Sequence, residues 1–284
     1  MSVPKRAFLD GQYGQIHYRQ SGLRSAKTHP LVCLHMFPQS GRNFERLLSV
    51  TPSDRLVIAP DFPGYGESSP PPHPISAQDY ASAIWQAIDM LDLLDTHGSV
   101  DLFGIHAGAK LAVEVAYQRP NDVRKIVLSS AAVLHPEELD QLRSVFSPIP
   151  LDDQGTRLQH LWNLLIKNRG PSMSYEMMAV SFAEMLRGGE GYEWGHHAVF
   201  EYNAIFPDVI ASLQHSIKLL NPNDDLYEMT PRTQRYLQNG DMVDRPDWGQ
   251  GFLESNAEDV WQVIQSFLDA EAVDSIEVDY AAAK

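Results

Sequence analysis

Cysteine is almost absent from this chain of 284 residues, since Cys33 is the only one. A single cysteine cannot close an internal disulfide, so the fold does not depend on an oxidising compartment. Positive charge is also scarce, because 22 lysines and arginines stand against 37 aspartates and glutamates, a formal net charge of −15. Nucleic acids and anionic membrane faces both need a basic surface. We therefore expect no nucleic-acid partner and no membrane partner.

Long apolar runs are missing as well. No run in the sequence approaches the roughly 18 residues of a membrane-spanning helix. The stretch from Met1 to Gly14 has no apolar centre of the kind that a signal peptide carries. We expect a cytoplasmic globular protein that handles a small-molecule substrate or ligand, and we leave a homodimer open.

Short apolar runs closed by glycine, proline or small residues are typical of buried parallel strands. The chain carries such runs at Leu31–Leu34, Arg55–Ala59, Val100–Phe103, Lys125–Leu128 and Ser216–Leu220. Helical patterns fall between them at Ala77–Leu94 and Lys110–Arg119. This alternation predicts an α/β fold with a mostly parallel central sheet flanked by helices.

The residue pattern of the sequence changes at Pro136. From there to about Ile205 the sequence has a helical pattern, is rich in Met, Trp, Tyr and His, and shows no clear strand. We predict a helical cap at 136–205, inserted into a core formed by 1–135 and 206–284.

Four sequence motifs occur in a fixed order. They are HMFPQSG at His35–Gly41, DFPGYGESS at Asp61–Ser69, GIHAGAK at Gly104–Lys110, and a C-terminal pair, NPNDDL at Asn221–Leu226 and WGQGFL at Trp248–Leu253. Together they resemble the capped α/β-hydrolase fold superfamily, with a match that covers roughly Phe8 to Leu268. The resemblance implies a mostly parallel sheet, an inserted helical cap and a catalytic site at the carboxyl ends of the strands.

Two of the three catalytic positions that the resemblance implies are substituted. The nucleophile of this fold sits on a tight G-x-S-x-G turn between a strand and a helix. Here that turn carries His106 at its centre, and no G-x-S-x-G occurs anywhere in the chain. The histidine that precedes the last helix is replaced by Gln250. The acid position matches Asp225, with Asp224 as the alternate.

The backbone of the site survives these side-chain changes. The resemblance implies an oxyanion hole formed by the N–H of Ala107 and by that of Phe37 or Met36. The N-terminus of a helix favours negative charge and should lower the pKa of His106. We expect neutral His106 to act as a general base, with Gln250 holding its tautomer and Asp225 holding Gln250.

This arrangement predicts non-covalent acid–base chemistry on a small, apolar or aromatic carbonyl compound. The reaction classes left open are hydrolysis by activated water, C–C bond cleavage, and a lyase or isomerase step through an enolate. We expect no cofactor and no metal, because phosphate loops, dinucleotide motifs and H-E-x-x-H are all missing from the sequence.

Six aromatic or imidazole side chains are expected to line the substrate pocket: His35, Trp194, His196, His197, Tyr202 and Trp248. Of the two adjacent histidines, at most one can point inward, because neighbours in a helix face different directions.

Two alternatives remain. One is a catalytically silent α/β-hydrolase-fold protein that binds a ligand. The other is a conventional serine esterase whose triad lies in a different register, with Ser40 or Ser130 as nucleophile.

Overall fold

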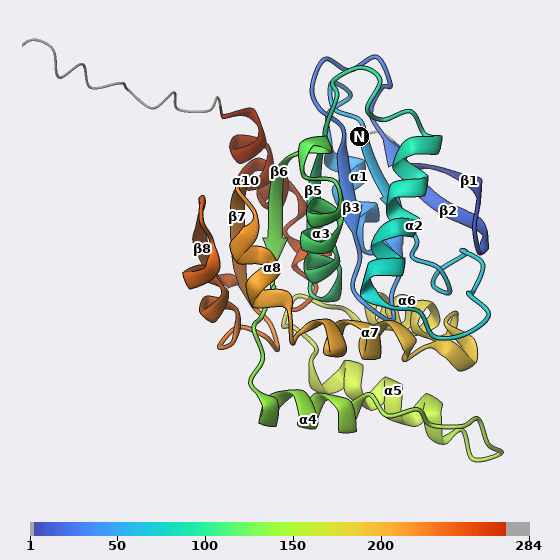
Figure 1. The fold of residues 1–284 in the computed structure, drawn as a ribbon. Coiled ribbons are helices and arrows are strands. Elements are labelled where there is room, and N and C mark those ends of the chain that lie inside the picture. Colours follow the sequence, from blue (N-terminus) through green and yellow to red (C-terminus); the bar gives the residue numbers. More distant parts are fainter. Residues whose placement is uncertain (1–2, 271–284) are drawn as a thin grey trace, which may run out of the picture.

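The computed structural model describes residues 3–270; residues 1–2 and 271–284, which the expected core included, lie outside the described residues. One sheet of eight strands runs through the molecule in the order β1-β2-β4-β3-β5-β6-β7-β8 (Figure 1). The strands are β1 (Lys5–Gly11), β2 (Gly14–Ser21), β3 (Leu31–Leu34), β4 (Val57–Pro60), β5 (Val100–Ile105), β6 (Val123–Ser129), β7 (Ser216–Asn223) and β8 (Gly240–Gly249). Only the pairs β1–β2 and β2–β4 are antiparallel. The predicted α/β fold with a mostly parallel sheet is confirmed.

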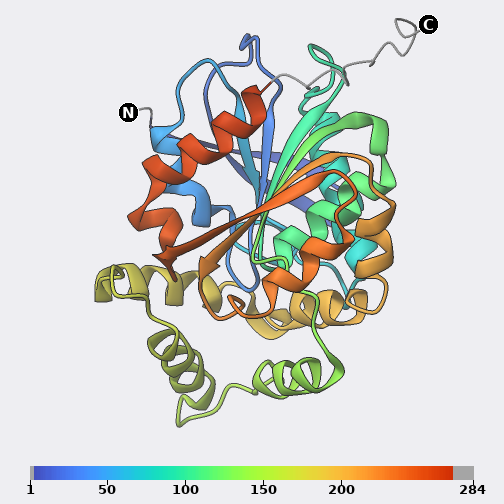
Figure 2. The ribbon, with the colours of Figure 1, turned by 90° about the vertical axis from the view of Figure 1, so that its left-hand side faces the viewer.

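The central strands are apolar because helices cover both of their faces. Every residue of β3, β4 and β5 is buried, including Cys33, which lies in the core of β3. One face packs against α2 (Ala77–Met90), α3 (Ala107–Gln118) and α8 (Phe206–Ser212), and the other against α1 (Glu45–Val50), α9 (Phe252–Ser255) and α10 (Ala257–Asp269) (Figure 2).

Three strands were not predicted, and two helices differ in their bounds. Helix α3 begins at Ala107 instead of Lys110. The unpredicted strands β1, β2 and β8 lie at the ends of the sheet, and β1 and β8 are largely exposed, so they carry no continuous apolar run. The helix expected to reach Leu94 stops at Met90. It stops there because Asp92 has a φ of 50°, which turns the chain out of the helix.

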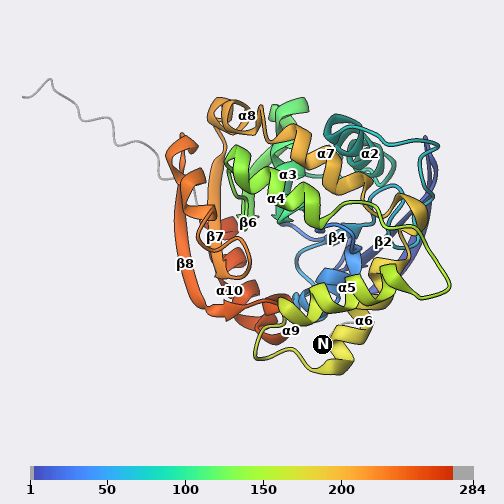
Figure 3. The same ribbon diagram turned by 90° about the horizontal axis from the view of Figure 1, so that it is seen from below.

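Between β6 and α8 lie four further α-helices, α4 (Pro136–Val145), α5 (Thr156–Lys167), α6 (Tyr175–Leu186) and α7 (Trp194–Tyr202). We call these helices the cap. They lie across the end of the sheet toward which β6 points, and they ring that end when the molecule is seen from below (Figures 1 and 3). The division of the chain into a core and a separate inserted domain stays a prediction.

Hydrogen bonds join the cap to the core. The hydroxyl of Tyr65, in the turn after β4, accepts from the N–H of Gly195 at 2.7 Å, and the hydroxyl of Ser40 donates to the buried carboxylate of Glu184 at 2.6 Å. Within residues 3–270, no helix is both long enough and apolar enough to cross a membrane.

Candidate active site

The turn between β5 and α3 places His106 at the carboxyl end of the sheet. His106 has φ 49° and ψ −118°, a conformation that is rare and strained for a residue with a side chain. The turn requires glycine at two positions, because other backbone atoms lie too close there for a Cβ. A Cβ on Gly104 would lie 2.3 Å from the carbonyl oxygen of Gly108, and one on Gly108 would lie 2.1 Å from that of Leu34. The sequence therefore builds a tight turn that lifts the imidazole above the strand ends.

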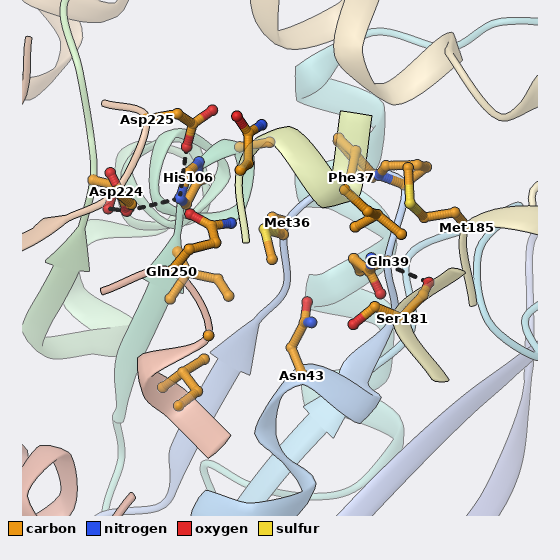
Figure 4. Close-up of a pocket in the computed structure, with 18 of the residues that line it drawn as sticks. Met36, Phe37, Gln39, Asn43, His106, Ser181, Met185, Asp224, Asp225 and Gln250 are labelled. Carbon is orange, nitrogen blue, oxygen red and sulfur yellow. Dashed lines mark hydrogen bonds and ion pairs between the residues drawn. The ribbon is translucent and has the colours of Figure 1, made fainter. Parts of the chain in front are cut away.

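The imidazole of His106 pairs directly with a buried carboxylate. Its Nε2 lies 3.0 Å from Oδ2 of Asp224, which follows β7 and has a side chain that is 1% exposed (Figure 4). Asp224 is held by two further donors, the hydroxyl of Ser130 at 2.5 Å and the N–H of Leu226 at 2.9 Å. Asp225, the preferred acid in the sequence prediction, is more distant: its Oδ1 is 3.9 Å from Nε2 and its side chain is 38% exposed. The structure thus brings the alternate, Asp224, onto His106.

The charge state of His106 is opposite to the one that the sequence predicted. Burial by itself lowers the pKa of His106, but the charge and hydrogen bond of Asp224, with a smaller contribution from Asp225, raise it to about 9. Burial would raise the pKa of Asp224, yet His106 and Ser130 hold it below its usual value. Both partners are therefore charged at neutral pH, and the expected neutral imidazole is wrong.

Gln250 does not take the expected place between His106 and an acid. It lines the same cavity and lies beside His106 in Figure 4. Its buried Oε1, however, accepts no hydrogen bond from residues 3–270. The expected relay from His106 through Gln250 to Asp225 is not formed, because the imidazole reaches Asp224 unaided.

The backbone donors expected for an oxyanion hole are open. Met36, Phe37 and Ala107 all line the cavity that contains His106. Within the described part of the chain, none of their N–H groups donates to a protein acceptor. Ala107 is the first residue of α3, where the aligned peptide dipoles favour a negative charge.

The loop that carries Met36 and Phe37 is held by His35. Its Nδ1 donates to the carbonyl oxygen of Met36 at 2.9 Å, and its Nε2 accepts from the N–H of Phe62 at 2.9 Å. Burial lowers the pKa of His35 to about 4, so the ring stays neutral and keeps this pair of bonds. His35 therefore braces the loop and does not line the cavity.

The cavity has a volume of about 430 Å³ and lies between the strand ends and the cap. Its walls are mostly apolar, with leucine, methionine and phenylalanine side chains from the cap helices. Among the aromatic and imidazole side chains expected to line the pocket, only His196 does so, stacked on Phe146 with ring centres 3.9 Å apart. Its neighbour His197 does not line the cavity, as expected for adjacent helical residues.

Three more of the expected pocket residues lie elsewhere. Trp248 is buried below the site, where it stacks on Phe252 and donates to Asp259 at 3.0 Å. Tyr202 is buried in the core and Trp194 begins α7, and neither lines the cavity. The reason is common to all three: an aromatic residue close to a motif in sequence is as readily used for packing as for a pocket.

Sequence reasoning missed two polar residues of the site. Ser130 was considered only as a nucleophile, whereas it orients Asp224. Lys110 lines the cavity and was not considered as a site residue, although it lies in the first four residues of α3, directly after the turn that carries His106.

One cluster offers three ligand atoms to a metal ion. These atoms, one each from His106, Asp224 and Asp225, lie within 4.8 Å of one another. His106 and Asp224 already satisfy each other as an ion pair, so the geometry requires no metal.

Comparisons with known proteins agree with this architecture. Residues 29–162 match the family model described as alpha/beta hydrolase fold. The chain also aligns with a solved esterase from Thermogutta terrifontis with a TM-score of 0.73 and 19% identity, over 93% of this chain and 98% of the esterase. The chain therefore has the α/β-hydrolase fold.

Two curated relatives share part of the sequence. A poly(3-hydroxyalkanoate) depolymerase from Ectopseudomonas oleovorans is 33% identical over 40% of this chain and 39% of its own length. A 3-hydroxybutyrate-oligomer hydrolase from Cupriavidus necator is 24% identical over 61% of this chain and 59% of its own length. The match thus spans less than two thirds of each relative, one of which is named a depolymerase and the other a hydrolase.

Proposed function

We propose that this protein is an enzyme that acts on small carbonyl compounds without forming an acyl-enzyme at the elbow. The observation that carries the proposal is the ion pair of His106 and Asp224 beside open backbone N–H donors. A charged imidazolium with one ring nitrogen on a carboxylate has an N–H left at the other nitrogen, Nδ1. The site is therefore rich in donors, and a developing oxyanion is what donors stabilise.

The reaction begins with the substrate carbonyl oxygen bound at the N–H groups of Ala107 and Phe37. When the bond between the α-carbon and a carboxylate group breaks, as in a β-keto acid, carbon dioxide leaves and the electron pair of that bond moves onto the carbonyl oxygen to form an enolate. His106 then donates its proton from Nδ1 to the intermediate and is re-protonated from solvent. Because His106 is charged at neutral pH, C–C cleavage and lyase or isomerase steps suit it better than activation of water by a base.

The cavity defines the substrate class. Its apolar wall and its volume of about 430 Å³ fit a small carbonyl compound with an alkyl or aromatic group. The two curated relatives are named for hydroxyalkanoate polymers and oligomers, whose ester carbonyls belong to the same broad class.

The test is a screen of purified protein with esters, lactones, β-diketones and β-keto acids. His106→Gln removes the proton donor and keeps a side chain that can hydrogen-bond, so we expect a rate loss of roughly 10²- to 10⁴-fold. Asp225→Asn is the matched control and should retain most of the activity, since Asp225 is the more distant carboxylate. Equal rates in wild type and His106→Gln would disprove the assignment.

A ligand-binding protein is the second candidate, and the substitution of both the nucleophile and the base position favours it. It predicts compounds that raise the melting temperature and are never turned over. A compound that is both bound and converted would exclude it.

A further inference from the structure

Lys110 is a buried amine in the wall of the catalytic cavity. It lies on α3, one turn after His106, and its N–H points to the carbonyl oxygen of His106 at 3.4 Å. The residue is 5% exposed and lines the same cavity as His106 and Ala107. His106 precedes α3 as its N-cap residue, and both His106 and Lys110 line this one cavity.

No acidic group neutralises this amine. Its Nζ donates to Oδ1 of Asn203 at 2.8 Å and lies 5.3 Å from the centre of the Phe206 ring. Glu114, one turn further along α3, accepts instead from Gln118 at 3.0 Å, and no ion pair of Lys110 exists within residues 3–270. A buried ammonium without a counter-ion is costly, and burial lowers the pKa of Lys110 to about 7.

Asn203 fixes the direction of the amine. Its Oδ1 also accepts from the N–H of Leu134 at 3.2 Å, and its Nδ2 donates to the carbonyl oxygen of Leu134 at 3.1 Å. These two bonds determine which way the amide faces, so that its oxygen is presented to Lys110. Oδ1 of Asn203 can accept a hydrogen bond from a neutral amine as well as from an ammonium. The neutral form of Lys110 therefore keeps this bond and has a lone pair on Nζ that can act as a nucleophile.

We propose that Lys110 is a nucleophile that forms an iminium with a ketone or aldehyde bound in this cavity. The lone pair of Nζ attacks the carbonyl carbon, a C–N bond forms, and the carbonyl oxygen takes a proton to give a carbinolamine. Loss of the hydroxyl as water, with a proton supplied by His106, leaves the C=N⁺ bond. No oxidant or reductant is needed. The inference uses the cavity of the proposed function and narrows its substrates from carbonyl compounds in general to ketones and aldehydes.

The chain contains a matched control lysine. Nζ of Lys125 donates to the carbonyl oxygens of Phe267 at 2.9 Å, Leu268 at 3.3 Å and Ala270 at 2.5 Å, at the end of α10. Burial also lowers the pKa of Lys125, but this lysine does not line the cavity. Lys125 therefore shows whether a lowered pKa is enough for labelling when no cavity is present to bind the carbonyl compound.

The experiment is reductive trapping of the whole protein with 4-phenylbutan-2-one and sodium cyanoborohydride at pH 7, followed by peptide mass spectrometry. At that pH about half of Lys110 is unprotonated, about a thousandfold more than an ordinary lysine with a pKa near 10.4. We expect one alkyl group on Lys110, none on Lys125, and complete loss of that label in Lys110→Arg. A folded wild-type protein that carries no label at Lys110, or that is labelled evenly over its lysines, would overturn the proposal.

Asn203→Asp gives a second measurement that does not depend on the folding of a Lys110 variant. A carboxylate of nearly the same shape beside Nζ stabilises the ammonium, so labelling at pH 7 should fall and its pH midpoint should rise. An unchanged midpoint in folded Asn203→Asp contradicts the proposal. His106→Gln separates the two proposals, because it should slow turnover by roughly 10²- to 10⁴-fold and still allow trapping, more slowly. Trapping without turnover in wild type would support the Lys110 proposal and contradict the proposed function.

Discussion

Replacing Asp224 by asparagine should reverse the pH behaviour of His106. In the wild type the pKa of His106 is about 9, against 6.5 in an unfolded chain. Asparagine keeps the shape of the side chain and removes its charge, so burial alone remains and lowers the pKa below 6.5. The imidazole would then be neutral at pH 7, and the proposed proton donor would be lost.

The size of the effect follows from the difference between the two pKa values. A rise of about 2.5 in the pKa of His106 corresponds to about 3 kcal/mol, because a change of 1 in pKa equals 1.36 kcal/mol in the free-energy difference between the charged and neutral forms. Because the folded value is raised, this stability is fully present below pH 6.5 and is lost as the pH rises through about 9. Asparagine keeps an oxygen that can accept from the N–H of Leu226, and loss of the bond from Ser130 adds a constant offset that does not vary across this range.

Urea denaturation of wild type and Asp224→Asn at pH 6 and at pH 10 measures the effect. The difference in unfolding free energy between the two proteins should be about 3 kcal/mol larger at pH 6, and taking the difference cancels most other titrating groups. Asp225→Asn is the control, with an expected change below about 1 kcal/mol because exposed ion pairs contribute little. NMR titration of the histidine rings, assigned with His106→Gln, gives the pKa directly. A wild-type midpoint at or below 6.5, or a stability difference that does not vary with pH, would refute the ion pair.

Two further variants test the surroundings of this pair. Ser130→Gly removes the hydroxyl that donates to Asp224 at 2.5 Å, and glycine is compatible with the φ of 56° at that position. We expect the free energy of unfolding, measured by urea denaturation, to fall by about 1.5–3 kcal/mol. A fall of less than about 0.5 kcal/mol would show that the bond is not important. The double variant His106→Ser with Gln250→His restores the nucleophile and base of a serine hydrolase beside Asp224, and it should react with a fluorophosphonate probe. The wild type should not react, and labelling of its Ser40 or Ser130 would instead support the shifted-register esterase.

The central sheet could be predicted from the sequence because its strands are buried on both faces. A run such as Leu31–Leu34 has no polar side to alternate with, and it ends where the chain turns into a loop. The edge strand β8 could not be found this way, because its burial pattern is mostly exposed and its sequence, GDMVDRPDWG, carries four charged residues. For such a strand the partner strand, and not the local sequence, determines the conformation.

The motif order predicted which loops meet at the carboxyl edge, but not which acid faces the imidazole. Asp224 and Asp225 are neighbours, and the register of β7 against β8 shifts between Pro222 and Asn223, just before them. An irregularity of this kind changes the direction of the following side chains, and no residue pattern reports it. The sequence predicted a lowered pKa for His106, and this was wrong because the carboxylate of Asp224 has a larger effect than the helix N-terminus. A helix N-terminus is worth about 0.3–2 kcal/mol, whereas the carboxylate at 3.0 Å contributes more than that after the cost of burial.

The chemistry of the site depends on the backbone position of the imidazole, which belongs to His106 at the elbow. In the serine enzymes of this fold a histidine stands between the nucleophile and the acid, so the acid acts through it on a hydroxyl. Here the imidazole starts from the elbow itself and reaches Asp224 at 3.0 Å, and this leaves no gap for another group to relay a proton. That explains why Oε1 of Gln250 has no hydrogen-bond partner among residues 3–270, although Gln250 lies beside the pair. Near His106 the cavity has three donors, the ring N–H at Nδ1 and the N–H groups of Ala107 and Phe37, and it is also lined by the carboxylate of Asp225. Because Asp224 and Asp225 raise the pKa of His106 to about 9, we propose that His106 acts as the acid while the backbone N–H groups stabilise an anionic oxygen.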